Sequence, residues 1–526
     1  MLKINYTAEY SSQRNLFFFG LICVFFAALA CLLFYVKYLG LNNLYYSSYS
    51  IFLNDSLEYI NTARSFVDHK HLVSSVMYPQ LITDSSSRLY MPGYYLVLAT
   101  FFYFFGATSL AALLPSMVAY VLSSVLIYSS GKKLYGQKVG VLASLFFMMT
   151  PLVLLYSVSA MSELTLVLVC LLIFYAFICT PQKAKLFLLP LLLAIPFMFR
   201  QTTFLMMFVL SAAYLQSEKI TKEKIFFLLV SLITTGFILS LLTKWQVNLG
   251  MKPFFSDIKI TNISAWFGKL LINLVENAKV FGAGYKENIY SGALAFCTIT
   301  FSYLLFFPAV LLFYYGCKKF KTDRYPLFLS AQVAAILLLT LITYTGAFAT
   351  VMRMCLFVYP FVLIVFSHII LKLGEKTKPQ GMIVGNIVKF ISISAIAFFL
   401  LLYFRIYYDG VHIYQNNLEQ LVKYSKLRED FIKNNNLNDS KVVIAPLELS
   451  VIYLSKHYPI KVFFYPMTDI ALELINNKYP IDTIVVTPTD LTKTFTKAAI
   501  NKIGLVQVGD KYCDGSEYII FKHQLF

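Results

Sequence analysis

Long runs of uncharged, apolar residues constrain the fold of this chain more than any other feature. Leu16–Val36 contains 21 residues without a charge, and Leu89–Gly131 contains 43. A helix of about 20 apolar residues, rising about 1.5 Å per residue, crosses the hydrocarbon layer of a membrane. Because 59% of the residues are hydrophobic and only 13% are charged, we predict a polytopic α-helical membrane protein. The first run is long and is followed by further apolar runs, so we expect a retained signal anchor rather than a cleaved signal peptide.

Further apolar runs predict about 11 transmembrane helices in total. Several of them are short, which indicates tilted or kinked packing. The expected spans are residues 16–38, 108–131, 139–157, 164–180, 186–199, 202–216, 225–246, 293–315, 326–345, 354–371 and 386–405.

The positive charges predict how these helices are oriented. The net charge is +18, but the Lys and Arg residues are spread among the loops between apolar runs, so we exclude nucleic acid as a partner. If the N-terminus is cytoplasmic, the basic connections also lie in the cytoplasm. Those connections carry Lys132, Lys133 and Lys138; Lys183 and Lys185; Lys219, Lys222 and Lys224; Lys318, Lys319, Lys321 and Arg324; and Lys372, Lys376 and Lys378.

This orientation depends on how residues 89–131 are interpreted. One interpretation has an interfacial segment at about 91–106 followed by one span, and Pro92-Gly93 favours it by marking a break before a segment too short for a full span. The alternative is a two-helix hairpin with an external N-terminus. The first interpretation places a multi-pass protein in the plasma (inner) membrane, with its C-terminal region periplasmic or extracellular.

Three long elements are then external: loop 39–107, loop 247–292 and the region after residue 405. Residues 1–405 form the predicted transmembrane module. Residues 406–526 are soluble in composition, and they contain short apolar runs separated by predicted helices, which is typical of a small α/β domain. The expected strands lie at 442–445, 462–465, 483–486 and 518–521.

An acidic pair in the first external loop is the leading catalytic candidate. Asp55 and Glu58 are three residues apart and would share one face of a helix. A carboxylate at a membrane boundary can act as a general base, and its neighbour can orient it or bind a cation. The alternative is that the pair only caps a helix.

Other candidates lie near the same predicted membrane surface. Glu163 begins a helix, either as a capping residue favoured by the helix dipole or as a second acidic wall of the site. Arg200 and Arg353 are external arginines, which either snorkel to lipid headgroups or clamp a phosphate with a bidentate fork. Tyr94 is one of several aromatic residues that could stack on a sugar ring.

Several familiar chemistries have no matching motif. The chain has no P-loop, no GxGxxG and no Gly-x-Ser-x-Gly, which argues against a nucleotide-driven pump and a serine hydrolase. It also lacks CxxC spacing, and its six histidines are scattered. No cofactor is therefore identified with certainty, and a divalent metal ion stays open as an alternative.

Several short segments between about residues 40 and 210 form a pattern. They are Asp55–Arg64, Met91–Ala99, Phe104–Gly106, Lys132–Gly136, Thr150-Pro151, Ser162-Glu163 and Phe199–Thr202. Together they resemble GT-C glycosyltransferases, in particular the bacterial branch related to protein O-mannosyltransferases and lipid A aminoarabinose transferases.

The resemblance implies transfer of a sugar from a polyprenyl-phosphate carrier to an acceptor on the external face. Asp55 matches the family's catalytic aspartate, acting as a general base or a metal-linked acid. The chain departs from the family at Met91, where many members have His or Lys, and at Gly93, where many have a second proline. The departures leave the subfamily open.

We therefore expect an inverting glycosyltransferase with Asp55 as its general base and Arg200 or Arg353 holding the donor phosphate. Glu58, Tyr94 and Glu163 are expected to complete the substrate site, and the acceptor to be a glycan, lipid or protein of the cell envelope. The alternatives are a transporter or flippase of lipid-linked sugars, and a non-catalytic membrane scaffold. No internal repeat is visible, which counts against transporter folds built from paired repeats.

Overall fold

The structure is a computed structural model in which part of the chain is described. The described residues are 4–39, 91–200, 222–248, 356–376, 480–488, 496–513 and 516–523. Single residues or short stretches are also described between 56 and 67, between 203 and 210 and between 426 and 477, together with residue 491.

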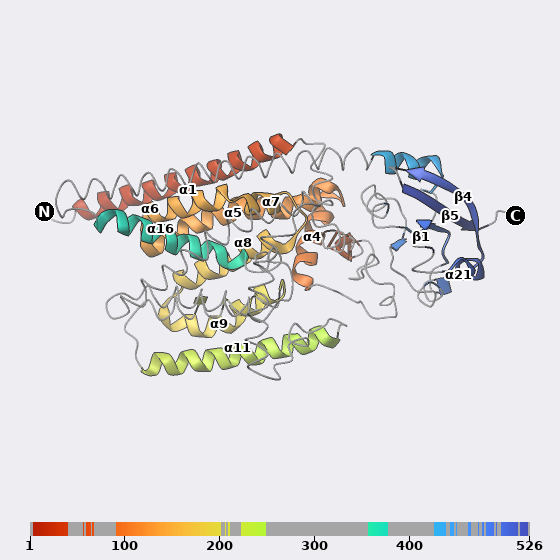
Figure 1. Cartoon of the computed structure of the whole chain (residues 1–526). Coiled ribbons are helices and arrows are strands. Elements are labelled where there is room, and N and C mark those ends of the chain that lie inside the picture. The colour runs from red at the N-terminus through yellow and green to blue at the C-terminus, as the bar shows by residue number, and fades with distance from the viewer. Residues whose placement is uncertain are drawn as a thin grey trace.

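Helices build the first part of the chain (Figure 1). Three of the described helices, at 110–135, 162–179 and 225–244, are long and apolar enough to cross a membrane. The predicted spans at 293–315, 326–345 and 386–405, and most of 202–216, lie outside the described residues. The helices are α1 (Ile4–Leu39), α4 (Pro92–Phe105), α5 (Ser109–Tyr135), α6 (Gln137–Met149), α7 (Pro151–Ser157), α8 (Ser162–Cys179), α9 (Gln182–Phe197), α11 (Lys222–Asn248) and, after the 3₁₀ turn Leu356–Val358, α16 (Tyr359–Lys376).

Residues 91–135 form two helices of unequal length. α4 has 14 residues, so it is about 21 Å long, short of the roughly 30 Å of a hydrocarbon core. Gly106 ends it with a φ of 74°, a left-handed conformation that favours glycine. α5 begins after Thr108, whose side chain accepts a hydrogen bond from the Ala111 amide. Only α5 is long enough to span the membrane, as the interfacial interpretation predicts.

Helices α1 and α5 run in opposite directions along the bundle (Figure 1). Gly20, in the first half of α1, lies against the ring of Tyr128, near the end of α5, with no room for a side chain between them. The N-terminus and the basic residues Lys132 and Lys133 are therefore at the same end of the bundle (Figure 1). The interfacial interpretation predicts this arrangement, whereas a two-helix hairpin with an external N-terminus would place them at opposite ends. Which side of the membrane this end faces stays a prediction.

The predicted span 139–157 is two helices rather than one. α6 ends at Met149 and α7 begins at Pro151, which lacks an N–H and so occupies the first turn of a new helix. Between them, the Thr150 hydroxyl bonds the Phe146 carbonyl at 2.7 Å and the Tyr359 hydroxyl of α16 at 2.9 Å. The Thr150–Tyr359 hydrogen bond thus holds α16 against the break between α6 and α7.

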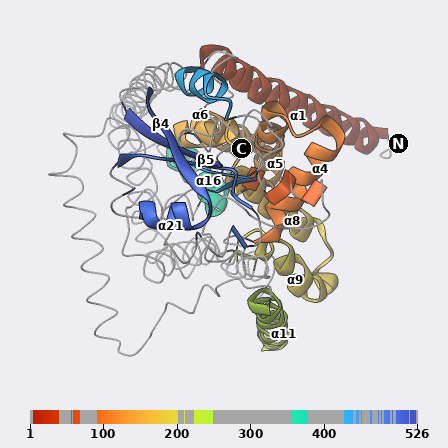
Figure 2. The same ribbon diagram turned by 90° about the vertical axis from the view of Figure 1, so that its right-hand side faces the viewer.

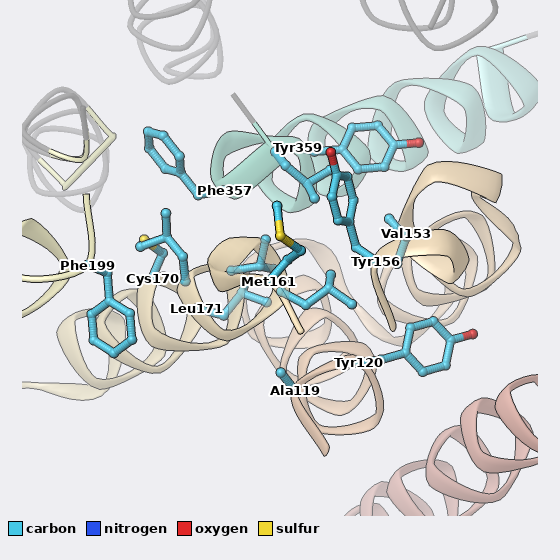
Figure 3. Packing of buried hydrophobic residues seen from close by; sticks show 14 of the residues in the cluster. Ala119, Tyr120, Val153, Tyr156, Met161, Cys170, Leu171, Phe199, Phe357 and Tyr359 are labelled. Atoms are coloured by element: carbon cyan, nitrogen blue, oxygen red, sulfur yellow. The ribbon is translucent and has the colours of Figure 1, made fainter. Parts of the chain in front are cut away.

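One apolar core joins these helices. Met161, just before α8, lies near Tyr156 of α7 and Tyr359 of α16 in this core (Figure 3). Phe174 of α8 and Phe361 of α16 pack edge to face with their centroids 4.8 Å apart. This core fixes the ends of α5, α8 and α9 relative to one another.

A five-stranded mixed sheet lies in the last part of the chain, with the strand order β2-β1-β3-β5-β4. Its strands are β1 (Val442–Ile444), β2 (Lys461–Phe463), β3 (Thr483–Val486), β4 (Leu505–Cys513) and β5 (Ser516–His523). β1 is parallel to β2 and β3, whereas β5 is antiparallel to β3 and β4. Four of the strands lie where the sequence predicted short buried strands, and β4 was missed.

The sheet is covered on both faces. Ile444, Ile484 and Phe521 pack with Ile500 of α21 (Lys497–Lys502) on one face. Val443, Val485 and Ile520 pack with apolar residues of helix 426–434 on the other, as expected when strand side chains alternate. The sheet lies beyond the end of the bundle at which α4 is found, and Figure 2 views the molecule from that end.

Candidate functional site

The first turn of α8 is the point at which the predicted site residues meet. Ser162 and Glu163 begin this helix at the end of the bundle opposite Lys132 and Lys133, and both are buried. The N-cap position is Met161, and no side chain caps the helix. Glu163 lies one position further on, in the first turn, where the helix dipole favours a carboxylate.

Glu163 instead forms an ion pair with Arg200. A guanidinium nitrogen of Arg200 donates to Oε1 of Glu163 at 2.9 Å, across 37 residues of sequence. The Glu163 side chain is 0% exposed and that of Arg200 14% exposed. Removing one partner of such a buried pair leaves an uncompensated charge and costs about 3–5 kcal/mol. The sequence offered Arg200 and Glu163 as separate candidates, and the structure pairs them.

The backbone around Arg200 is held by a tight turn at the end of α9. The Arg200 amide donates to the Pro196 carbonyl at 3.1 Å. The Arg200 carbonyl accepts from the Thr203 amide at 3.1 Å and from the Thr203 hydroxyl at 2.7 Å. Both ends of the Arg200 residue are therefore fixed, which limits the positions open to its guanidinium.

Helix α4 is attached to the same turn. The Gly93 amide donates to the Met198 carbonyl at 2.8 Å. A Cβ on Gly93 would lie 2.7 Å from the Phe199 ring and 2.8 Å from the Met198 carbonyl oxygen. A proline, which many family members have at this position, could not donate this hydrogen bond. Gly93 is thus suited to a closer approach of α4 to α9.

The described residues of the first loop are bound to the α8 turn. The Ser56 hydroxyl donates to the Met161 sulfur at 3.2 Å, and the Tyr59 and Ser162 hydroxyls are hydrogen-bonded at 3.1 Å. Tyr59 also packs on two aromatic rings of α4, with centroid distances of 4.7 Å to Tyr94 and 5.3 Å to Tyr95. The segment that carries the acidic pair is therefore attached to α8 and α4.

Tyr94 lies inside the junction at which α4, the first turn of α8, Arg200 and the first-loop residues Ser56 and Tyr59 meet. Its hydroxyl is beside Ser116 of α5 and close enough to Glu163 for the two to interact electrostatically. Burial raises the pKa of Tyr94 above its usual value, so the hydroxyl stays protonated at neutral pH. Ser116 in turn donates to the Ser159 carbonyl at 2.7 Å. Tyr94 is fully buried, so as placed it packs inside the site rather than on its surface.

The structure thus brings three predicted residues together: Tyr94, Glu163 and Arg200. The others, Asp55, Glu58 and Arg353, lie outside the described residues. Within the described ranges, no group of three or more His, Cys, Asp or Glu side chains could hold a metal ion.

Ser56, Tyr59 and Ser116 belong to this junction but were not predicted as site residues. The spacing of Ser56 and Tyr59 could have indicated one helical face turned towards the protein. Nothing in the sequence indicates their partners on α8, because those lie more than 100 residues away.

Comparisons with known proteins agree with the predicted resemblance. Residues 91–242 match the sequence model of the dolichyl-phosphate-mannose-protein mannosyltransferase family. No curated protein matches the chain by sequence.

The overall structure is similar to those of several solved proteins. ArnT from Cupriavidus metallidurans in the apo state has a TM-score of 0.48 and 11% identity, covering 94% of this chain and 98% of its own. The same protein bound to undecaprenyl phosphate has a TM-score of 0.45 and 10% sequence identity. The match covers 95% of this chain and 98% of that protein.

The oligosaccharyltransferase AglB from Archaeoglobus fulgidus, in complex with an inhibitory peptide and a dolichol-phosphate, gives a TM-score of 0.44 and 10% identity, covering 89% of this chain and 69% of its own. The family match includes α4, Ser116, the first turn of α8 and Arg200, whereas Ser56 and Tyr59 lie before it. Over residues 91–242, the chain is similar to a family of mannosyltransferases, and the predicted resemblance to glycosyltransferases is confirmed there.

Proposed function

We propose that this protein transfers a sugar from a polyprenyl-phosphate donor to an acceptor on the external face of the plasma (inner) membrane. The observation that carries the proposal is the junction of α4, α8 and Arg200 inside the segment that matches the mannosyltransferase family. A guanidinium held at a membrane boundary suits the phosphate of a lipid carrier, because its fork can bind two phosphate oxygens.

In the proposed reaction, Asp55 accepts the proton of an acceptor hydroxyl. The hydroxyl oxygen attacks the anomeric carbon of the donor from the face opposite the phosphate, with inversion of configuration. The bond between that carbon and the phosphate oxygen breaks, and the oxygen keeps the electron pair. Arg200 or Arg353 stabilises the negative charge that develops on the leaving phosphate. Glu58 and Tyr94 help to shape the site.

A transfer assay tests this proposal. Membranes containing the full chain are incubated with radiolabelled undecaprenyl-phosphate sugars of the hexose and pentose series and with envelope extract as acceptor. We expect labelled product together with free undecaprenyl phosphate. Asp55→Asn should lower the rate by about 10²-fold or more, because a carboxamide cannot act as a general base.

Asp510→Asn is the matched control, since Asp510 is an exposed carboxylate on β4. It should leave the rate unchanged. Full activity of Asp55→Asn would contradict the assignment of the base. Movement of the intact donor across the membrane without bond cleavage would instead support the flippase alternative.

A further inference from the structure

The Glu163–Arg200 pair differs from an ordinary surface ion pair in where its two members lie. Glu163 has no exposed side-chain surface, whereas Arg200 keeps a small exposed part. A ligand from outside can therefore reach Arg200 more readily than Glu163. The Arg200 main chain is held by Pro196 and Thr203, and the ion pair with Glu163 holds the guanidinium.

The position of Glu163 also connects Arg200 to the first loop. Glu163 follows Ser162, which bonds Tyr59, and Met161, which bonds Ser56. Tyr94 packs on Tyr59 and interacts electrostatically with Glu163. A shift of Glu163 would therefore move the Arg200 guanidinium. It would also disturb the contacts of Ser56 and Tyr59, which lie next to Asp55 in the sequence.

We infer that Glu163 is a positioning residue: it orients the Arg200 guanidinium so that the exposed part of that group meets the donor phosphate. This inference rests on the proposed function. It gives Glu163 a different role from the substrate contact expected from sequence, because its carboxylate acts through Arg200 and does not touch the sugar.

Binding of undecaprenyl phosphate to the purified full chain tests this role. We expect Glu163→Gln to raise the Kd by about tenfold, which is the effect of losing a charge-assisted hydrogen bond that orients the ligand's partner. Glu223→Gln is the matched control, because Glu223 also lies in the first turn of a helix, α11, but is exposed. It should leave the Kd unchanged.

The effect must also depend on Arg200. In an Arg200→Gln background, Glu163→Gln should change the Kd by less than about twofold, since coupled residues do not act additively. In the transfer assay, Glu163→Gln should raise the KM for the donor and leave the KM for the acceptor unchanged. A merely structural role would reduce the amount of folded enzyme without that selective change. Glu163→Asp, which keeps the charge, serves if Glu163→Gln does not fold, and should raise the Kd less.

The possible failures are distinguishable. If the unaltered chain does not bind undecaprenyl phosphate, the proposed function and the role of Glu163 are both overturned. If the unaltered chain binds and Glu163→Gln binds equally well, only the role of Glu163 is overturned. The same holds if Glu163→Gln weakens binding equally with and without Arg200.

Discussion

At the scale of single residues, the junction depends on the small size of one residue and the negative charge of another. Gly93 lets the backbone of α4 come against the end of α9, and Glu163 compensates a guanidinium that would be costly to bury alone. Each of these two effects depends on the neighbour, which is the end of α9 for Gly93 and Arg200 for Glu163. The departure from the family pattern at Gly93 therefore has a structural reason, because its amide makes a bond that proline cannot make.

Gly93→Ala tests the close approach of α4 to the end of α9, because alanine keeps the amide N–H and adds only a methyl group. The added methyl group would contact the Phe199 ring and the Met198 carbonyl, so we expect a loss of about 1–3 kcal/mol in stability and a lower transfer rate. The loss is measured by thermal unfolding in detergent and by the transfer assay. An alanine variant as stable and as active as the unaltered chain would show that α4 does not need this close approach.

At the scale of elements, glycines also determine how closely α5 and α6 pack. A Cβ on Gly131 would lie 2.8 Å from the Cα of Gly140, and a Cβ on Gly140 would contact the Tyr128 carbonyl. Small residues of this kind allow membrane helices to approach closely where the hydrophobic effect does not drive association. The same two helices are joined by Ser144, whose hydroxyl bonds the Ser124 carbonyl at 3.0 Å.

Gly140→Ala should therefore destabilise the protein by about 1–3 kcal/mol, because the added methyl group forces α5 and α6 apart. Gly236→Ala in α11 provides the comparison, since a Cβ there meets nothing within 4 Å. It should be neutral or stabilising by about 0.5–1 kcal/mol, through the helix propensity of alanine. Unfolding temperatures in the same detergent measure both changes, and equal effects would contradict the packing explanation.

At the scale of the whole molecule, the structure separates basic connections from the candidate site. Lys132, Lys133 and the N-terminus lie at one end, and Glu163, Arg200 and the sheet lie towards the other (Figure 1). The positive-inside rule then predicts that the first end is cytoplasmic.

Cysteine labelling tests this orientation in a chain whose own eight cysteines have been replaced. Lys511→Cys on β4 and Lys138→Cys on α6 are both at exposed positions. A maleimide that cannot cross membranes should label Lys511→Cys in intact cells, and should label Lys138→Cys only after the membrane is permeabilised. Labelling of Lys138→Cys in intact cells would reverse the proposed orientation.

How much could be predicted from sequence depended on the range of the interactions. Apolar runs and Pro92 identified α4 and α5, because these signals are local. Pro151 was equally local, but its helix break was missed when 139–157 was taken as one span. β4 was missed because most of its residues are exposed at the edge of the sheet, so it lacks a buried apolar pattern. The contact between Glu163 and Arg200 depends on tertiary packing, which no local pattern reveals.

The bond between Thr150 and Tyr359 has a consequence for the order of events during synthesis. The two residues are 209 positions apart, so α6 and α7 emerge from the ribosome long before α16. During that interval the Thr150 hydroxyl can donate to the Phe146 carbonyl of its own helix, which avoids the cost of an unsatisfied group in lipid. The chain around Thr150 and Pro151 can therefore enter the membrane before α16 is made. When α16 follows, the Tyr359 hydroxyl adds a second hydrogen bond to Thr150.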